Sequence, residues 1–238
     1  GLLYEALFPE HPLGREVLGT ESSVAVIDRD DIIRFHDHWY RAPNLVVAAA
    51  GAVDHDALVA QVAEAFSGRT GGAAPVRSAP VAEPVEAGRL TRPTEATHVA
   101  WGWLGLRRDD PRRHALALGI HVLGGGLSSR LFQTVREDHG LAYSVFSSMA
   151  GYADAGVVSV YAGTAPDRAD ELQRVVAGQV AEVASNGITA AELAIARDGF
   201  EGSILLGLED SGSRMSRLGA SQSLLGRVVP LDEYVETL

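Results

Sequence analysis

The chain contains 238 residues, 46% of them hydrophobic, which is enough for one large domain or two medium ones. Its formal net charge is −11 at pH 7, and this acidic balance opposes binding to nucleic acid or to anionic membranes, because phosphate contacts need clustered cations. The absence of cysteine excludes disulfides and thiolate sites. No stretch approaches the roughly 18 apolar residues of a membrane span. We therefore expect a globular, cytoplasmic protein without nucleic-acid or membrane partners.

The N-terminal part predicts a helix, a strand and a second helix. Residues 30–39 have helical apolar spacing that ends at Pro43. The short apolar run 44–51 (NLVVAAAG) predicts a buried strand, because it is too short and too rich in small residues for a helix. Asp54 is placed to cap the next helix, which continues to Phe66.

The composition changes after this helix. Residues 68–93 are rich in Gly, Ala, Pro and Ser and have no sustained period. A connection of this length is too long for an ordinary loop inside a compact domain. We therefore predict a linker over residues 69–93, which separates residues 1–68 from residues 94–238.

The C-terminal part predicts three strands and five helices. A capping box formed by Thr189 and Glu192 marks one helix start, and Asp167 is placed to cap another. Three glycines at 124–126 end a helix that begins near Pro111. The predicted strands are 97–106, 142–150 and 156–164, and the predicted helices are 111–121, 127–136, 167–184, 189–208 and 210–225.

A weak internal repeat links the two parts. The apolar, glycine, aspartate and leucine positions of residues 46–63 return in the same order within residues 157–181. Short strand–helix pairs also match by chance, so this pattern alone leaves a repeat and a coincidence equally open.

The histidines predict no metal site. His36 and His38 lie two residues apart, and such positions on a helix point to different faces. Neither H-E-x-x-H nor H-x-x-E-H occurs in the chain. The same test finds no carboxylate or histidine partner at ligand spacing for His11, His55, His98, His114 and His139.

Two further segments contain residues typical of anion-binding sites, but each favours a structural interpretation without a ligand. The glycines at 124–126 lack the lysine of a phosphate loop, and Ser128 is not in a G-x-S-x-G elbow. They predict a helix end followed by a helix start that Ser128 caps. The arginines between 107 and 113 are interrupted by Asp109 and Asp110, which favours a solvated turn over a phosphate site.

Arg136 and Tyr143 form the sharpest candidate pair. Arg136 lies near the end of a predicted helix, and Tyr143 opens the next strand after a turn at Gly140. Both side chains donate hydrogen bonds to carbonyl oxygens, so together they could clamp an extended peptide. Spacing alone favours a surface arginine paired with Glu137 or Asp138, beside a half-buried tyrosine.

The block around this pair, residues 123–144 (LGGGLSSRLFQTVREDHGLAYS), resembles the second homologous domain of the mitochondrial processing peptidase family. Pitrilysin and insulysin are larger relatives in this group of inverted-motif zinc metallopeptidases, the inverzincins. Residues 7–20 (LFPEHPLGREVLGT), with Trp39, Tyr40 and Asn44, also resemble the family. The resemblance implies an α+β fold of two homologous domains, each a mainly antiparallel sheet with helices on one side. The first domain would be incomplete, ending at residue 68.

The resemblance also implies a zinc metalloendopeptidase. In the family, an H-x-x-E-H helix holds zinc, and its glutamate is the general base for zinc-bound water. Those residues precede the block that matches residues 7–20. We therefore expect zinc in a longer parent, but no catalytic residue and no metal ligand in this segment. Residues 117–121 (ALGIH) correspond to the zinc motif in the second domain, with Ala and Ile where His and Glu would be needed.

In the family, an arginine and a tyrosine seven residues apart bind the substrate backbone, and Arg136 and Tyr143 match them. The resemblance therefore favours the peptide clamp, with an extended peptide adding to a sheet edge. It also implies a homodimer or a paired subunit. Two alternatives stay open: a non-catalytic homologue that acts as partner subunit or scaffold, and an unrelated α+β domain that binds a small ligand near the glycine turn.

Overall fold

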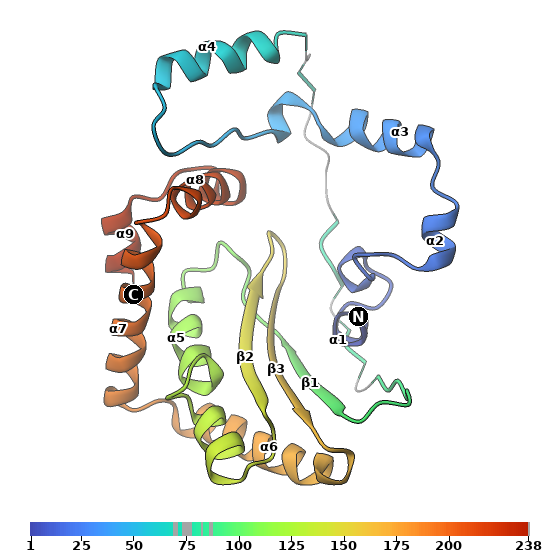
Figure 1. The fold of residues 1–238 in the computed structure, drawn as a ribbon, viewed down its shortest axis with the longest axis vertical. Coiled ribbons are helices and arrows are strands. Elements are labelled where there is room, and N and C mark those ends of the chain that lie inside the picture. The colour runs from blue at the N-terminus through green and yellow to red at the C-terminus, as the bar shows by residue number, and fades with distance from the viewer. Residues whose placement is uncertain (69–70, 73–77, 82, 86–87, 238) are drawn as a thin grey trace. The chain divides into compact units, whose positions relative to one another are not determined.

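The computed structural model describes residues 1–68, 71–72, 78–81, 83–85 and 88–237. These residues form two compact units (Figure 1), and each unit is assembled from segments that are distant in sequence. Unit 1 comprises Gly1–Arg15, Ala79–Glu201 and Val235–Leu238, and unit 2 comprises Glu16–Ser78 and Gly202–Tyr234. Part of the predicted linker, residues 69–93, lies outside the described residues. The division into two homologous domains stays a prediction.

Unit 1 is built on a three-stranded antiparallel sheet. Its strands are β1 (Thr97–Leu104), β2 (Ser144–Gly151) and β3 (Gly156–Thr164), in the order β1-β3-β2. β3 therefore has a neighbour on each side, while β1 and β2 are the edge strands. In the register, Trp101 and Ser147 both lie opposite Val160. The predicted strands are confirmed, and β3 has the predicted bounds.

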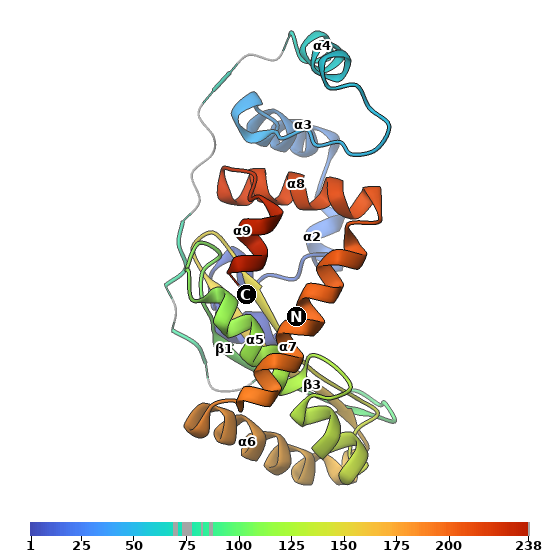
Figure 2. The same ribbon diagram turned by 90° about the vertical axis from the view of Figure 1, so that its left-hand side faces the viewer.

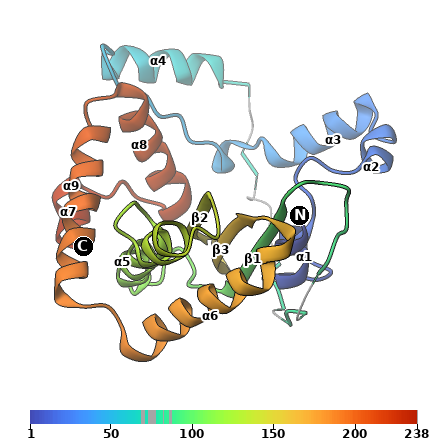
Figure 3. The same ribbon diagram turned by 60° about the horizontal axis from the view of Figure 1, so that its bottom comes forward.

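Two helices cover one face of this sheet, α5 (Arg113–Gly124) and α6 (Ala169–Asn186) (Figures 1 and 3). The core lies between them and the sheet, because alternate strand residues point to this side. Each large aliphatic side chain buried here contributes roughly 1.5–3 kcal/mol to folding. The fully buried members are Leu131, Val135, Val160, Ala162, Leu172 and Val176.

The first helix, α1 (Leu2–Leu7), covers part of the opposite face. Leu7 and Phe8 form a buried cluster with Val157. Gly102 permits this approach, since a Cβ there would lie 2.6 Å from Leu3 Cδ1. Toward the other end of this face, the residues that the structure describes include the exposed His98, Ser144, Phe146 and Ser148.

Helix α7 (Ala190–Gly207) begins with the predicted capping box. Glu192 Oε2 accepts a hydrogen bond from the Thr189 amide at 2.7 Å, and Thr189 Oγ1 accepts one from the Glu192 amide at 3.2 Å. The first turns of α7 pack against α5 through Ala196 (Figure 2). Arg130 adds a bidentate ion pair to Glu192, which sequence reasoning missed.

Unit 2 is helical in its described residues. Its elements include α2 (Glu21–Ala25), α3 (Arg29–Trp39), α4 (His55–Ala65) and α8 (Ser211–Leu225). The predicted cap at Asp54 is confirmed, because its carboxylate accepts a hydrogen bond from the Ala57 amide at 2.8 Å.

Three terminal elements were not predicted by the apolar periodicity. They are α1, α2 and α9 (Leu231–Glu236), which have only five or six residues each. Helices this short bury too few side chains to produce a clear period. Helix α1 is held by contacts in the folded chain, whereas α2 is exposed and begins with a capping box between Thr20 and Ser23.

The predicted strand over residues 44–51 is wrong. Ala42–Asn44 form a 3₁₀ turn, and the backbone beyond it is extended at Leu45 (φ −114°, ψ 134°) but belongs to no sheet in the described part of the chain. An apolar run predicts an extended, buried segment, whereas a strand also requires a neighbouring backbone to complete its hydrogen bonds.

Three local predictions at the starts of elements, two helices and one strand, are also wrong. The helix predicted over 127–136 begins at Arg130, and Ser129 rather than Ser128 lies at its start, with its hydroxyl donating to the Gly126 carbonyl at 2.6 Å. Asp167 does not cap α6, because Pro166–Arg168 form a 3₁₀ turn and the helix begins at Ala169. Tyr143 precedes β2 by one residue.

In the described residues, we find no helix that is both long and apolar enough to cross a membrane. The cytoplasmic location stays a prediction.

Candidate functional site

Arg136 lies on a π-helix, η3 (Phe132–Asp138), which follows two α-helical residues, Arg130 and Leu131. The wider winding is visible in the His139 amide, which donates to the Thr134 carbonyl five residues earlier at 3.2 Å. Leu131 and Val135 are fully buried and fix the helix against the core. Short π-helical segments are rare and often occur at functional sites. The segment therefore presents Arg136 from a rigid base.

The Arg136 guanidinium lies between two aromatic rings. Its central carbon is 4.7 Å from the ring centroid of Phe132 and 4.7 Å from that of Tyr143. Such cation–π contacts hold a guanidinium in place while leaving its N–H groups free to donate. Arg136 Nε is also 3.5 Å from Glu137 Oε1.

The turn before Tyr143 is fixed by side chains from β3 and from the 3₁₀ turn that precedes α6. Thr164 Oγ1 donates to the Leu141 carbonyl at 2.7 Å, and Arg168 Nη1 donates to the Gly140 carbonyl at 2.9 Å. Gly140 has a positive φ of 56°, which glycine adopts without strain. The backbone is held, yet the Tyr143 side chain is 84% exposed.

The structure thus brings Arg136 and Tyr143 together, and we refer to them as the Arg–Tyr pair. The contact of Arg136 with Glu137 agrees with the surface interpretation, but the half-buried tyrosine of that interpretation is wrong. A guanidinium and a phenol side by side offer several donors to carbonyl oxygens. Sequence reasoning missed Phe132, whose signal is its position four residues before Arg136.

The pair lies at the start of an edge strand. In the described residues β2 pairs with β3 alone, so the outer edge of β2 has backbone N–H and C=O groups outside the ladder. An extended chain beside β2 would therefore meet both backbone groups and the Arg–Tyr pair.

The part of the chain that the structure describes contains no group of three or more His, Asp or Glu side chains able to hold a metal. In the segment 117–121, the His121 ring packs edge-on against Phe200 with centroids 5.1 Å apart. The His36 ring stacks on Tyr40 at 4.8 Å. These residues do not fit a zinc site, so no catalytic step is assigned to a metal on this chain.

The glycine turn is a packing feature. A Cβ at Gly124 would lie 2.6 Å from the Ser147 amide nitrogen, so only glycine lets α5 approach β2 this closely. In the neighbouring arginine cluster, Arg107 and Arg112 are solvated as predicted, whereas Arg108 and Arg113 are partly buried and donate to the carbonyls of Gly151 and Arg108. Arg112 Nη2 lies 2.7 Å from Asp110 Oδ2, and these hydrogen bonds lower the pKa of Asp110 to about 2.

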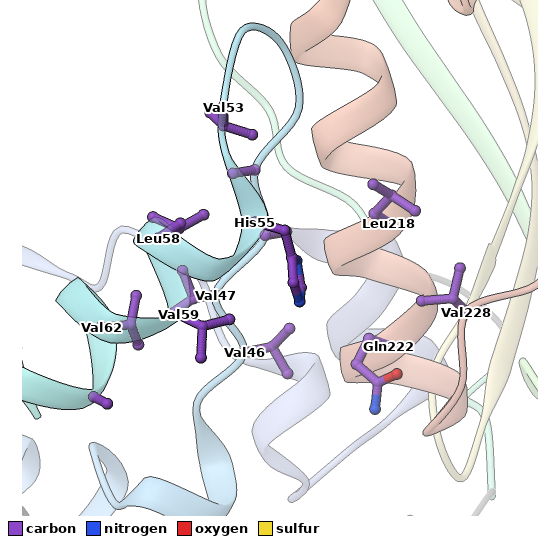
Figure 4. A pocket seen from close by; sticks show the side chains of 13 residues that line it. Val46, Val47, Val53, His55, Leu58, Val59, Val62, Leu218, Gln222 and Val228 are labelled. Carbon is purple, nitrogen blue, oxygen red and sulfur yellow. The ribbon is translucent and has the colours of Figure 1, made fainter.

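Unit 2 contains an apolar pocket of about 560 Å³ (Figure 4). It lies between the extended residues 46–49, helix α4 and helix α8. His55 and Gln222 are polar groups in an otherwise aliphatic lining. Such a wall suits an apolar chain segment and offers little chemistry for a reaction.

Known proteins similar to this chain are described as zinc proteases. A family model described as "Peptidase M16 inactive domain" matches residues 27–200. An uncharacterized zinc protease of Mycobacterium bovis is 48% identical over 232 residues, covering 93% of this chain and 52% of the relative. The uncharacterized zinc protease YmxG of Bacillus subtilis is 35% identical over 240 residues, covering 100% of this chain and 58% of YmxG. The chain thus spans about half the length of the curated relatives it matches.

Two solved structures have folds similar to that of this chain. The peptidase M16 inactive domain from Pseudomonas fluorescens has a TM-score of 0.90 at 28% identity, covering 98% of this chain and 56% of that one. A protease from Helicobacter pylori has a TM-score of 0.84 at 21% identity, covering 99% and 58%, and shows the fold alone. The chain therefore belongs to the peptidase M16 family, the pitrilysin-like zinc peptidases that its sequence resembles, and corresponds to the region described as the inactive domain.

Proposed function

We propose that this chain is the peptide-binding portion of a longer zinc metalloendopeptidase. The observation that carries the proposal is the Arg–Tyr pair: an arginine held between two aromatic rings, beside a tyrosine that is 84% exposed at the start of an edge strand. The exposed ring leaves the Tyr143 hydroxyl accessible to a bound peptide, and the held backbone fixes where that hydroxyl lies. The names of the relatives support a protease parent.

The proposed way of binding a peptide follows from the hydrogen-bonding groups of β2, Arg136 and Tyr143. The outer edge of β2 pairs with the backbone of an extended peptide, which gives affinity with little dependence on sequence. Arg136 and Tyr143 donate hydrogen bonds to peptide carbonyls at the start of this strand. These contacts align the peptide but break no bond. Zinc and the general base belong to residues of the parent outside this chain.

Turnover and metal content together test the proposal. In the intact protein, Arg136→Ala and Tyr143→Phe should each lower cleavage of extended peptides about tenfold or more, while the zinc content stays unchanged. Arg174→Ala, an exposed arginine on α6, is the matched control and should keep full turnover. Wild-type turnover in both site variants would refute the peptide-binding role.

The second candidate is a non-catalytic partner subunit or scaffold. The matched family model favours it, because its description is that of an inactive domain. The two candidates differ in the parent sequence: an H-x-x-E-H helix preceding this segment, with one zinc per protein by elemental analysis, supports the peptidase. A parent without the motif and without zinc supports the scaffold.

We also propose that residues 1–68 form part of a first domain homologous to the second, which follows the linker over residues 69–93. A homodimer or a paired subunit, and a cytoplasmic location, complete the proposal, and sedimentation and cell fractionation test them.

A further inference from the structure

The face of the sheet that points away from α5 and α6 is only partly covered. We call this the open face. Helix α1 covers its end near Gly102, where Leu3 and Leu7 approach the backbone. Toward the other end, His98 and Phe146 are exposed, and Phe146 is exposed to 45%.

Three aromatic rings cross this uncovered part in one row, one from each strand. The Phe146 and Tyr161 rings have centroids 5.1 Å apart, and these two residues lie directly opposite each other in the β2–β3 register. The Tyr161 and His98 rings have centroids 6.0 Å apart and are nearly parallel at 21°. The Tyr161 hydroxyl lies 2.7 Å from His98 Nδ1. This hydrogen bond fixes the central ring of the row.

Small residues surround the rings. Gly163 lies between His98 and Ser144 in the register, and the Tyr161 hydroxyl lies only 3.5 Å from the position a Cβ would take at Gly163. Ser148 and Ser159 form a neighbouring pair whose hydroxyl oxygens are 2.8 Å apart. None of these residues is an Asp, Glu, Lys or Arg, in a chain whose net charge is −11. The surface is therefore an aromatic platform bordered by small, uncharged side chains.

The platform lies on the same chain segment as the Arg–Tyr pair. Phe146 follows Tyr143 by three residues, about 10 Å in an extended strand, and at this odd spacing the two side chains point to opposite faces of the sheet. A peptide that pairs with the outer edge of β2 lies about 4.8 Å from it, and its alternate side chains project onto the open face. One of them lies beside Phe146, about three residues from the peptide residue at Tyr143.

We propose that the open face around Phe146, Tyr161 and His98 is a side-chain subsite that selects an aromatic residue at one position of the bound peptide. The inference rests on the proposed peptide binding at β2 and the Arg–Tyr pair. An aromatic side chain pairs with the Phe146 ring and covers its exposed edge, whereas an acidic one loses hydration on this aromatic surface.

Equilibrium binding of fluorescent peptides to the intact protein, with zinc chelated to prevent cleavage, tests the proposal. The probes are peptides of ten residues that are identical except for one position, scanned in turn as Phe, Ala or Asp. The wild-type protein should bind Phe about tenfold more tightly than Ala at one position only, and Asp more weakly than Ala. Phe146→Ala should abolish this preference and leave the affinity for the Ala peptide unchanged. Leu206→Ala, an exposed leucine in unit 2, is the matched control and should retain the preference.

Two further variants separate the subsite from a folding defect. Phe146→Leu should keep the Ala-peptide affinity and retain part of the Phe preference, since it preserves apolar volume without the ring. Arg136→Ala should weaken every peptide by the same factor and leave the preference intact. A wild-type protein that binds peptides without any aromatic preference, or a Phe146→Ala variant that keeps the preference, overturns the subsite alone. A wild-type protein that binds none of the peptides overturns the peptide-binding function and the subsite with it.

Discussion

Replacing Glu192 by glutamine removes one charge from the contact between Arg130, just before η3, and the start of α7. Glu192 accepts hydrogen bonds from Arg130 Nε at 2.7 Å and Arg130 Nη2 at 2.8 Å, and it also accepts from Thr189. The hydrogen bonds from Arg130 are the largest cause that lowers the pKa of Glu192 from 4.5 to about 2. Glutamine keeps the carbonyl acceptor of a capping box, so the substitution isolates the charge.

The lowered pKa of Glu192 sets an upper limit on the free energy of unfolding that this carboxylate contributes. Because each pKa unit corresponds to about 1.4 kcal/mol, a fall from 4.5 to about 2 gives an upper limit of about 3.4 kcal/mol. The two side chains are 17% and 28% exposed, and partial solvent screening reduces this value. We expect Glu192→Gln to lower the free energy of unfolding by about 1–2 kcal/mol at pH 7.

The sign of the pH dependence follows from the lowered pKa. The contribution of Glu192 is fully present above its unfolded pKa near 4.5 and is lost as the pH falls toward about 2. Urea unfolding of wild type and Glu192→Gln at several pH values should therefore show a difference that shrinks between pH 4.5 and pH 2. Glu201→Gln, an exposed glutamate on α7, should change stability by less than about 0.5 kcal/mol. Equal stabilities at pH 7, or a difference that stays constant to pH 2.5, would refute the reasoning.

Three further substitutions test the core, the strand turn and the support of the site. Leu172→Ala removes a fully buried side chain from the main core and should cost about 2–5 kcal/mol in urea unfolding; a loss below 1 kcal/mol would contradict its place there. Gly156→Ala places a Cβ 2.1 Å from the Leu106 carbonyl oxygen. We therefore expect the free energy of unfolding to fall by about 1–3 kcal/mol, with a lower Tm. An unchanged Tm would count against this close approach. Arg168→Ala removes the donors to Gly140 and His139, and it should weaken peptide binding several-fold at nearly constant Tm; unchanged affinity would mean that the turn needs no such support.

Local signals predicted the elements whose cause is local. The cap at Asp54 and the box at Thr189 require only a side chain and an amide three residues away, and both are found. β3 was predicted with its correct bounds because it is continuous, apolar and bounded by turns. The strand over 44–51 failed because its pairing depends on a partner backbone, which no local pattern reveals.

Part of the candidate site was likewise predictable from the sequence, and part of it was not. The spacing of Arg136 and Tyr143, with the family resemblance, predicted the two residues, and the structure brings them together. The π-helical winding was not predictable, since it depends on how Leu131 and Val135 fit the core. The row of His98, Tyr161 and Phe146 depends on cross-strand register, which joins residues more than 60 positions apart in the case of His98 and Tyr161.

The most direct test of peptide binding at the Arg–Tyr pair is a double-mutant cycle on peptide affinity, measured by calorimetry on the intact protein with zinc chelated. Tyr143→Phe removes the hydroxyl but keeps the ring on Arg136, and Arg136→Ala removes the guanidinium. We predict that each lowers affinity about tenfold and that the double variant loses less than the product of the two, because both groups hold the same stretch of backbone. Wild-type affinity in both single variants would contradict the account.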